Sequence, residues 1–178
     1  MRRNRVLGEL IVIATAQFVL LMIVSEALHP GYSVSYNYIS DLGVGATSIL
    51  FNPSVAFLGV STILVGLKAE GLRRTERIAL TFAGVGALGV GLFPETTGAP
   101  HLISALLAFL FGGLSAVLTS RLKEPVWTAL GLASLVSLAL FLLRVYGPLG
   151  PGGLERLIVY PVLIWAISFG TRLAQGTS

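Results

Sequence analysis

Cysteine is absent from this chain of 178 residues, and only 11% of its residues are Asp, Glu, Lys or Arg. Without thiols the chain cannot form disulfides, thiolate nucleophiles or cysteine-ligated metal centres. With 54% hydrophobic residues and a mean hydropathy of +0.87, it also lacks the polar surface that a water-soluble globule needs. The composition therefore predicts a multi-pass protein of the cell membrane.

Six apolar runs divide the chain, each close to the roughly 20 residues that a helix needs to cross a bilayer. The runs cover residues 6–28, 48–67, 76–93, 101–120, 126–146 and 155–174. They predict an all-α fold: one domain over residues 1–178, built as a bundle of six transmembrane helices. An even number of spans places both termini on the same side of the membrane.

The basic residues are distributed unequally between the two sides of this predicted bundle. Ten of the twelve fall on the side of the termini: Arg2, Arg3, Arg5, Lys68, Arg73, Arg74, Arg77, Arg121, Lys123 and Arg172. Because Lys and Arg gather on the cytoplasmic side of membrane proteins, both termini are predicted to be cytoplasmic. The clusters are short and lie beside the spans, so topology explains the pI near 9.9, and nucleic acid is not a predicted partner.

Small residues recur at four-residue spacing in the third and fourth runs. The third run carries Ala79, Ala83, Ala87 and Gly91, and the fourth carries Ser104, Ala108, Gly112, Ala116 and Ser120. Helices in lipid associate by close packing, which small residues permit. We expect these two helices to form a tight antiparallel hairpin at the centre of the bundle. Such faces also allow a homo-oligomer or another membrane protein as partner.

The connection between the first two runs is the longest and is rich in hydroxyl and aromatic groups. Tyr32, Tyr36 and Tyr38 suit the headgroup level, where an amphipathic ring keeps its face in lipid and its hydroxyl in water. Ser40 and Asp41 are typical of a helix start. We expect this connection to contain a short turn and to fold over the outer end of the bundle.

Several short motifs, spread over nearly the whole chain, carry a family resemblance. They are Tyr32-Ser33 and Tyr38-Ile39-Ser40-Asp41-Leu42-Gly43, then Phe51-Asn52, Leu92-Phe93-Pro94 followed by His101, and Gly153-Leu154-Glu155-Arg156 followed by Tyr160-Pro161 and Trp165. In these motifs the chain resembles the prokaryotic membrane family called domain of unknown function 998, which implies six helices and brings no established activity. A more remote likeness is to the alkaline-ceramidase-type intramembrane hydrolases, which use a histidine cluster around zinc. This chain has two histidines and lacks their paired-histidine motif.

Polar residues on the predicted outer side come from all six helices and the first outer connection. The candidate ligand-binding residues are Glu26, His29, Tyr32, Asn37, Tyr38, Asp41, Asn52, Glu95, His101, Arg144, Glu155, Arg156 and Tyr160. Ionisable groups at membrane depth are costly unless they are paired or hydrated, so their convergence predicts a functional site. We expect a polar pocket that opens to the outer leaflet.

The leading hypothesis is a protein that binds a polar small molecule or a membrane lipid headgroup in this pocket. Arg144 and Arg156 would hold a phosphate or carboxylate through paired donors. The alternative role for the same arginines is an internal ion pair with Glu26, Glu95 or Glu155.

Two further hypotheses remain open at the level of sequence. The first is a metal-dependent hydrolase of lipids, with Glu26, His29, Asp41, His101 and also Glu95 as candidate ligands of zinc or another divalent ion. The second is a structural or assembly subunit that contacts another membrane protein through its small-residue faces. The sequence assigns no cofactor and leaves open whether a reaction is catalysed.

Overall fold

The computed structural model describes residues 2–122 and 125–176, and within these ranges the chain is all-helical. The long helices are α1 (Arg2–Leu28), α2 (Ser48–Lys68), α3 (Arg74–Leu92), α4 (Ala99–Thr119), α5 (Pro125–Leu142) and α6 (Gly150–Gln175). Short 3-10 turns occupy the connections: η1 (Ser40–Gly43), η2 (Gly45–Thr47), η3 (Glu95–Thr97), η4 (Ser120–Leu122) and η5 (Gly147–Leu149). The predicted all-α bundle is thus confirmed, and so is the short turn within the first long connection.

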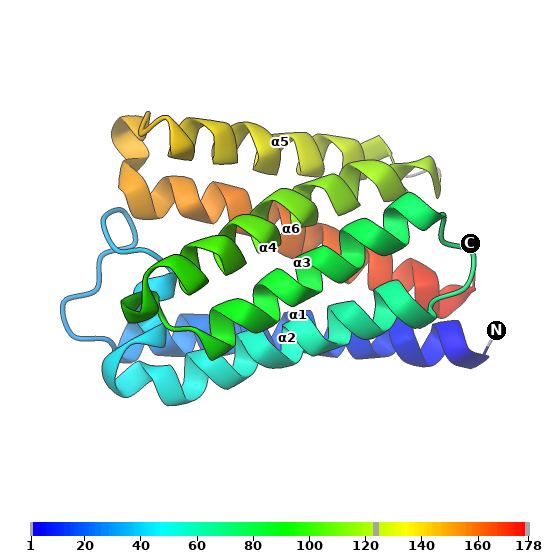
Figure 1. Cartoon of the computed structure of the whole chain (residues 1–178), viewed down its shortest axis with the longest axis horizontal. Coiled ribbons are helices and arrows are strands. Elements are labelled where there is room, and N and C mark those ends of the chain that lie inside the picture. Colours follow the sequence, from blue (N-terminus) through cyan, green and yellow to red (C-terminus); the bar gives the residue numbers. More distant parts are fainter. Residues whose placement is uncertain (1, 123–124, 177–178) are drawn as a thin grey trace.

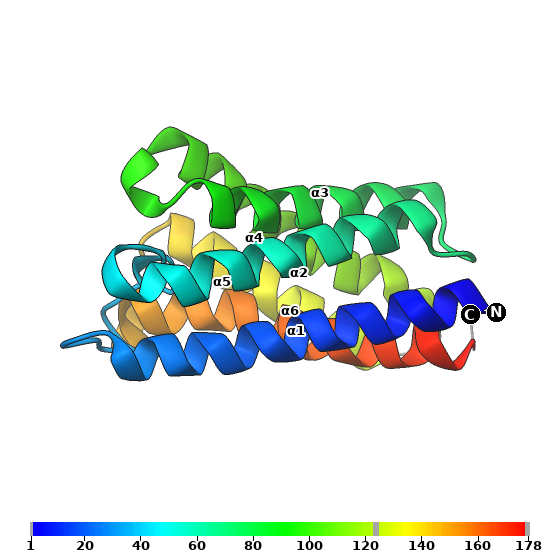
Figure 2. The same cartoon turned by 90° about the horizontal axis from the view of Figure 1, so that it is seen from below.

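The six helices run roughly along one axis and form a closed ring (Figures 1 and 2). Each packs against its neighbours in the sequence, and α1 closes the ring by packing against α6. Both ends of the chain therefore lie at the same end of the bundle (Figure 1). We call this the basic end, and we call the opposite end, where residues 29–47 lie, the loop end.

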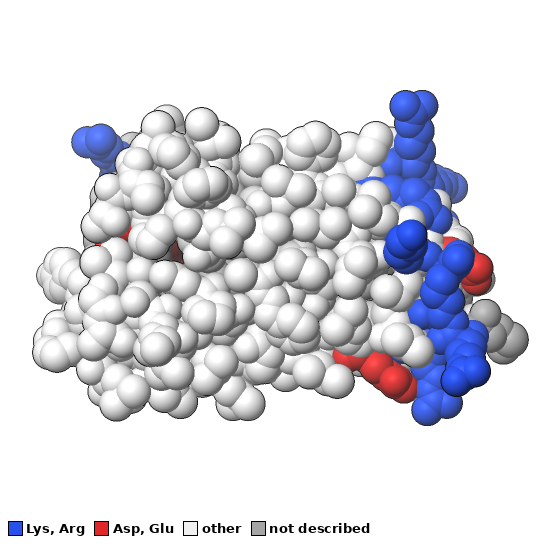
Figure 3. Space-filling view, turned by 60° about the horizontal axis from the view of Figure 1, so that its bottom comes forward, with Lys and Arg blue, Asp and Glu red and all other residues white. Residues whose placement is uncertain are grey.

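The surface between the two ends is apolar, as contact with lipid requires. Large side chains such as Ile13, Val60, Leu102, Val136 and Ile164 are exposed along the helices. Figure 3 shows a broad uncharged band, with most of the visible Lys and Arg gathered at one end of the molecule. Among the described residues, five helices are long and apolar enough to cross a bilayer. The protein is a helical membrane protein.

Helix α3 is not among these five helices. It has 19 residues, and its first turn carries Arg74, Glu76 and Arg77. It nevertheless runs alongside α2 and α4 for its length (Figure 2).

Glycines bring α3 close to both of its neighbours. A Cβ atom on Gly59 of α2 would lie 2.3 Å from the backbone nitrogen of Leu88, and one on Gly86 would lie 2.2 Å from that of Ala108 in α4. The tight hairpin of α3 and α4 is therefore confirmed, but it forms one side of the ring of six helices rather than the centre of the bundle. Its closest approach uses Gly86, not the stripe that contains Ala87.

The basic end is held by a buried carboxylate. Glu76 is 1% exposed, accepts a hydrogen bond from the backbone N–H of Arg73, and pairs with Arg121 through an Nη2–Oε2 contact of 2.8 Å. This pair ties the start of α3 to η4, the short turn that follows α4. Lys123, one of the predicted cytoplasmic cations, lies outside the described residues.

Candidate functional site: the loop end and the cavity beneath it

Arg156 fastens the connection between α1 and α2 to the bundle. It lies in the second turn of α6, is 4% exposed, and donates through Nη2 to Glu26 Oε1 and to the Tyr32 hydroxyl, both at 2.6 Å. Its Nη1 donates to the carbonyl oxygens of Val34 at 3.0 Å and Asn37 at 3.2 Å. The ion pair predicted as one of the alternatives for this arginine is therefore present, with Glu26 as partner.

Glu155, the residue before Arg156, binds a different part of the connection between α1 and α2. Its Oε2 accepts a hydrogen bond of 2.6 Å from the backbone N–H of Ile39. The chain comes this close to α6 because position 152 is glycine, where a Cβ atom would lie 2.1 Å from the carbonyl oxygen of Asn37. The backbone N–H of Gly152 donates to the carbonyl oxygen of Ser35 at 2.9 Å.

The polar side chains of the connection also bond to one another. The Asn37 amide donates to Asp41 Oδ2 at 2.8 Å, the backbone N–H of Tyr38 donates to the same oxygen at 3.0 Å, and the Tyr32 hydroxyl donates to the carbonyl oxygen of Tyr38 at 2.8 Å. Burial raises the pKa of Tyr32 to about 12, although the charge of Arg156 acts in the opposite direction. Tyr32 therefore stays protonated and remains a donor.

A second attachment joins the connection to the α3–α4 turn. Ser40 Oγ donates to Glu95 Oε2 at 3.2 Å, and Asp41 lies close enough to share a hydrogen bond with the same carboxyl group. Burial raises the pKa of Glu95 above its usual value, and the hydrogen bond and charge of Asp41 raise it further.

The two histidines lie in different surroundings. His101 is 4% exposed, and its Nδ1 lies 2.8 Å from the carbonyl oxygen of Phe93. His29 is half-buried at the end of α1, with its ring 5.4 Å from that of Tyr32. In the part of the chain that the structure describes, no group of three or more His, Asp and Glu side chains could hold a metal ion.

The remaining predicted residues lie around these attachments. The Asn52 amide donates to the carbonyl oxygen of Gly43 at 3.1 Å and so holds the connection to α2. Tyr160 is 36% exposed, one turn beyond Arg156 on α6. Arg144 is exposed just after α5, with a positive φ of 59°, and makes no ion pair among the described residues. The structure thus brings most of the predicted polar residues together as bonds that close the loop end.

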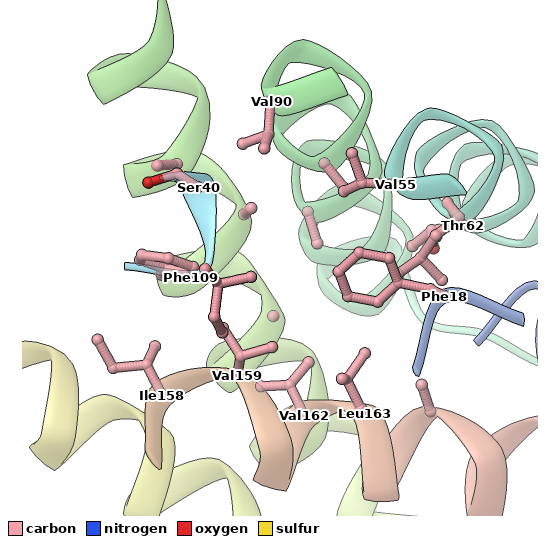
Figure 4. Close-up of a pocket in the computed structure, with 18 of the residues that line it drawn as sticks. Phe18, Ser40, Val55, Thr62, Val90, Phe109, Ile158, Val159, Val162 and Leu163 are labelled. Atoms are coloured by element: carbon pink, nitrogen blue, oxygen red, sulfur yellow. Dashed lines mark hydrogen bonds between the residues drawn. The ribbon is translucent and has the colours of Figure 1, made fainter. Parts of the chain in front are cut away.

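Beneath the closed end lies a cavity of about 130 Å³ in the middle of the ring (Figure 4). Side chains of α1, α2, α3, α4 and α6 line it, and Phe18, Val55, Val90, Phe109 and Val162 give it apolar walls. Its polar groups include Ser40, His101 and Glu155, which lie on segments at the loop end.

The cavity is elongated along the bundle. Its lining residues run from Phe51 to Thr62 on α2, from His101 to Gly112 on α4 and from Glu155 to Ala166 on α6. Each stretch is about three helical turns, or about 16 Å at a rise of 1.5 Å per residue.

Sequence reasoning missed the apolar walls of this cavity. Ala83 and Ala87 were interpreted as helix-packing residues, whereas they line the cavity together with Ala105. Their only signal in the sequence is small size, which is shared with residues that pack against a neighbouring helix.

Comparison with protein families gives a match over residues 12–172 to the model described as "Protein of unknown function (DUF998)". The chain belongs to this family. No curated protein and no solved structure matches it. The family resemblance predicted from the sequence motifs is therefore confirmed.

Proposed function

We propose that this DUF998 protein binds a single-chain amphiphile in the cavity between its helices. The hydrocarbon chain lies among the apolar walls, and the head group lies at the loop end beside His101 and Glu155. The observation that carries the proposal is the match between the cavity and one leaflet. The residues that line the cavity extend over about 16 Å of helix. One leaflet has nearly the same thickness, because half of a hydrocarbon core of about 30 Å is about 15 Å.

The size of the cavity leaves no room for a whole lipid. Its volume of about 130 Å³ is close to the 150 Å³ of an engineered apolar cavity that binds benzene and stays dry. Apart from Thr62 and the polar groups at the loop end, the lining residues offer water no side-chain hydrogen-bond partners, so an apolar occupant is favoured over water along the walls.

The position of the cavity in the membrane follows from the proposed topology. All six helices, α3 included, cross the bilayer, with the basic end in the cytoplasm and the loop end outside. The concentration of Lys and Arg at the basic end supports this orientation. The absence of cysteine from the sequence makes it easy to test.

The topology test uses single cysteines and a maleimide that does not cross membranes. Tyr36 is 77% exposed at the loop end, and Thr75 is exposed in the first turn of α3 at the basic end. We expect Tyr36→Cys to be labelled in intact cells and Thr75→Cys to be labelled only after the membrane is opened. The reverse pattern would invert the orientation.

The function test uses Trp165, which lines the cavity and is 3% exposed. Bromododecane in nanodiscs should quench its fluorescence through the bromine atom, and Trp165→Phe should remove this component of quenching. Ala87→Phe, which fills the cavity, should abolish the effect. The matched control is Ala133→Phe on the exposed face of α5, which should leave it intact. Equal quenching in both alanine variants would refute binding in the cavity.

A further inference from the structure

The connection between α2 and α3 contributes to the positive charge at the basic end (Figure 3). Within residues 68–77 the chain carries Lys68, Arg73, Arg74 and Arg77, with Glu70 and Glu76 as acids. Both carboxylates have a cation from another segment, because Glu70 pairs with Arg3 and Glu76 pairs with Arg121. Arg77 donates to carbonyl oxygens at the end of α2. The other three cations are exposed and make no ion pair among the described residues.

Two of these cations continue exposed apolar faces of their helices. On α2, Leu64 is exposed, and Lys68 follows it by four residues, so the two side chains lie on one face. On α3, Ile78 and Phe82 are exposed, and Arg74 precedes Ile78 by four residues. Each apolar face therefore ends in a cation at the basic end.

The two faces lie beside each other on the outside of the ring. Helices α2 and α3 are adjacent and in close contact, as Gly59 permits. The cavity lies on the inner side of this pair, since Leu58 of α2 and Ala87 of α3 line it. Lys68 ends α2 and Arg74 begins α3, so both cations lie at the same level of the bundle.

From this arrangement we infer that the outer face of α2 and α3 binds an anionic phospholipid of the leaflet at the basic end. The lipid phosphate contacts Lys68 and Arg74, and the acyl chains lie along Leu64 and Ile78. Clusters of Lys and Arg beside a transmembrane helix attract anionic lipids in this way. A zwitterionic lipid gains less, because its own cation lies next to the phosphate. The cavity has no room for a phospholipid, so this site is separate from the one proposed above.

A second copy of the chain fits the same face less well. Two copies in the same orientation, related by a two-fold axis, would present the same surface to each other. Lys68 and Arg74 of both copies would then meet at one level of the membrane, where like charges repel. An anionic lipid offsets these charges instead.

The experiment is native mass spectrometry of the intact protein in detergent, titrated with phosphatidylglycerol or with phosphatidylcholine that has identical acyl chains. We expect the first phosphatidylglycerol to bind about tenfold or more tightly than the first phosphatidylcholine, as two cations near one anionic head group predict. This comparison is made on the wild-type protein.

Two double variants with the same change of charge identify the site. Lys68→Gln with Arg74→Gln should weaken phosphatidylglycerol binding by about tenfold or more and leave phosphatidylcholine binding nearly unchanged. The matched control is Arg2→Gln with Arg5→Gln, which removes two exposed cations of α1 at the same end. It should keep most of the preference. Equal losses in both double variants would overturn the site, because the preference would then follow the total charge of the basic end.

A second measurement locates the bound lipid through an added tryptophan. Ile78→Trp places the reporter on the proposed site, and Leu102→Trp places it on an exposed position of α4 at the loop end. In phosphatidylcholine nanodiscs, brominated phosphatidylglycerol should quench the Ile78→Trp reporter more than brominated phosphatidylcholine does at the same low mole fraction. The Leu102→Trp reporter should show no such difference. Equal ratios at the two positions would contradict binding at α2 and α3.

Three further results would overturn the inference. The first is equal affinity of the wild-type protein for the two lipids. The second is displacement of phosphatidylglycerol by an equal concentration of glycerol phosphate, which would assign the cations to a free phosphate. The third is a dimer that does not bind phosphatidylglycerol, which would assign the face to a second copy. If the Lys68 and Arg74 double variant does not fold, the wild-type affinities and the two tryptophan reporters decide.

Discussion

Replacing Arg156 by Gln should strongly destabilise the protein, because Glu26 would be left without its cation. The side chains of Arg156 and Glu26 are 4% and 16% exposed, so this pair belongs to the buried class and not to surface pairs worth about 0–1 kcal/mol. Removing one partner of a buried pair costs about 3–5 kcal/mol. Since Glu26 keeps some contact with solvent, we expect about 3 kcal/mol.

The measurement is equilibrium unfolding in mixed micelles, followed by tryptophan fluorescence. The matched control is Arg144→Gln, which removes the same charge at the same end but affects an exposed side chain without an ion pair among the described residues. We expect this control to change the free energy of unfolding by less than about 0.5 kcal/mol. Adding Glu26→Gln to Arg156→Gln should recover part of the lost free energy of unfolding, because neither member of the ion pair then remains as an unpaired charge.

Two results would refute this reasoning. The first is a decrease in the free energy of unfolding that is no larger in Arg156→Gln than in Arg144→Gln. This result would mean that the ion pair does not stabilise the loop end. The second is strict additivity of Glu26→Gln and Arg156→Gln, since groups in direct contact should show an interaction energy of at least about 0.5 kcal/mol.

Two more predictions concern Glu95 and Gly86. The raised pKa of Glu95 means that the folded state favours the protonated acid, so its stabilising contribution is full below the ordinary pKa of 4.5 and is lost as pH rises through the raised value. Thermal unfolding should therefore show a loss of stability between pH 4 and pH 7 in the wild type and a smaller loss in Glu95→Gln. The same pH dependence in both proteins would contradict this role of Glu95. Gly86→Ala should cost about 1–3 kcal/mol, because its Cβ would meet the backbone of Ala108 at 2.2 Å and α3 and α4 would have to separate. Gly153→Ala, whose Cβ would meet only the Leu149 side chain at 3.1 Å, should cost far less in the same unfolding assay, and equal losses would refute the packing argument.

The sequence alone predicted the helical bundle and the concentration of basic residues at one of its ends. Apolar runs mark helices because the bilayer imposes a fixed thickness, and the two ends of the bundle differ because Lys and Arg avoid one side of the membrane. The short turn at Ser40–Gly43 was also predictable, since Ser and Asp at a helix start and the glycines after it are local signals. Each of these features depends on residue type and distance along the chain.

Tertiary structure decided which polar residues meet and where the cavity lies. Glu155 and Arg156 are neighbours in the sequence, yet one lines the cavity and the other closes the loop end through Glu26. Gly86 and Ala87 are both small, yet one packs against α4 and the other faces the cavity. The direction of a side chain depends on how its helix is rotated about its axis. In a membrane, close packing of neighbouring helices sets that rotation, because both faces of a helix can be equally apolar.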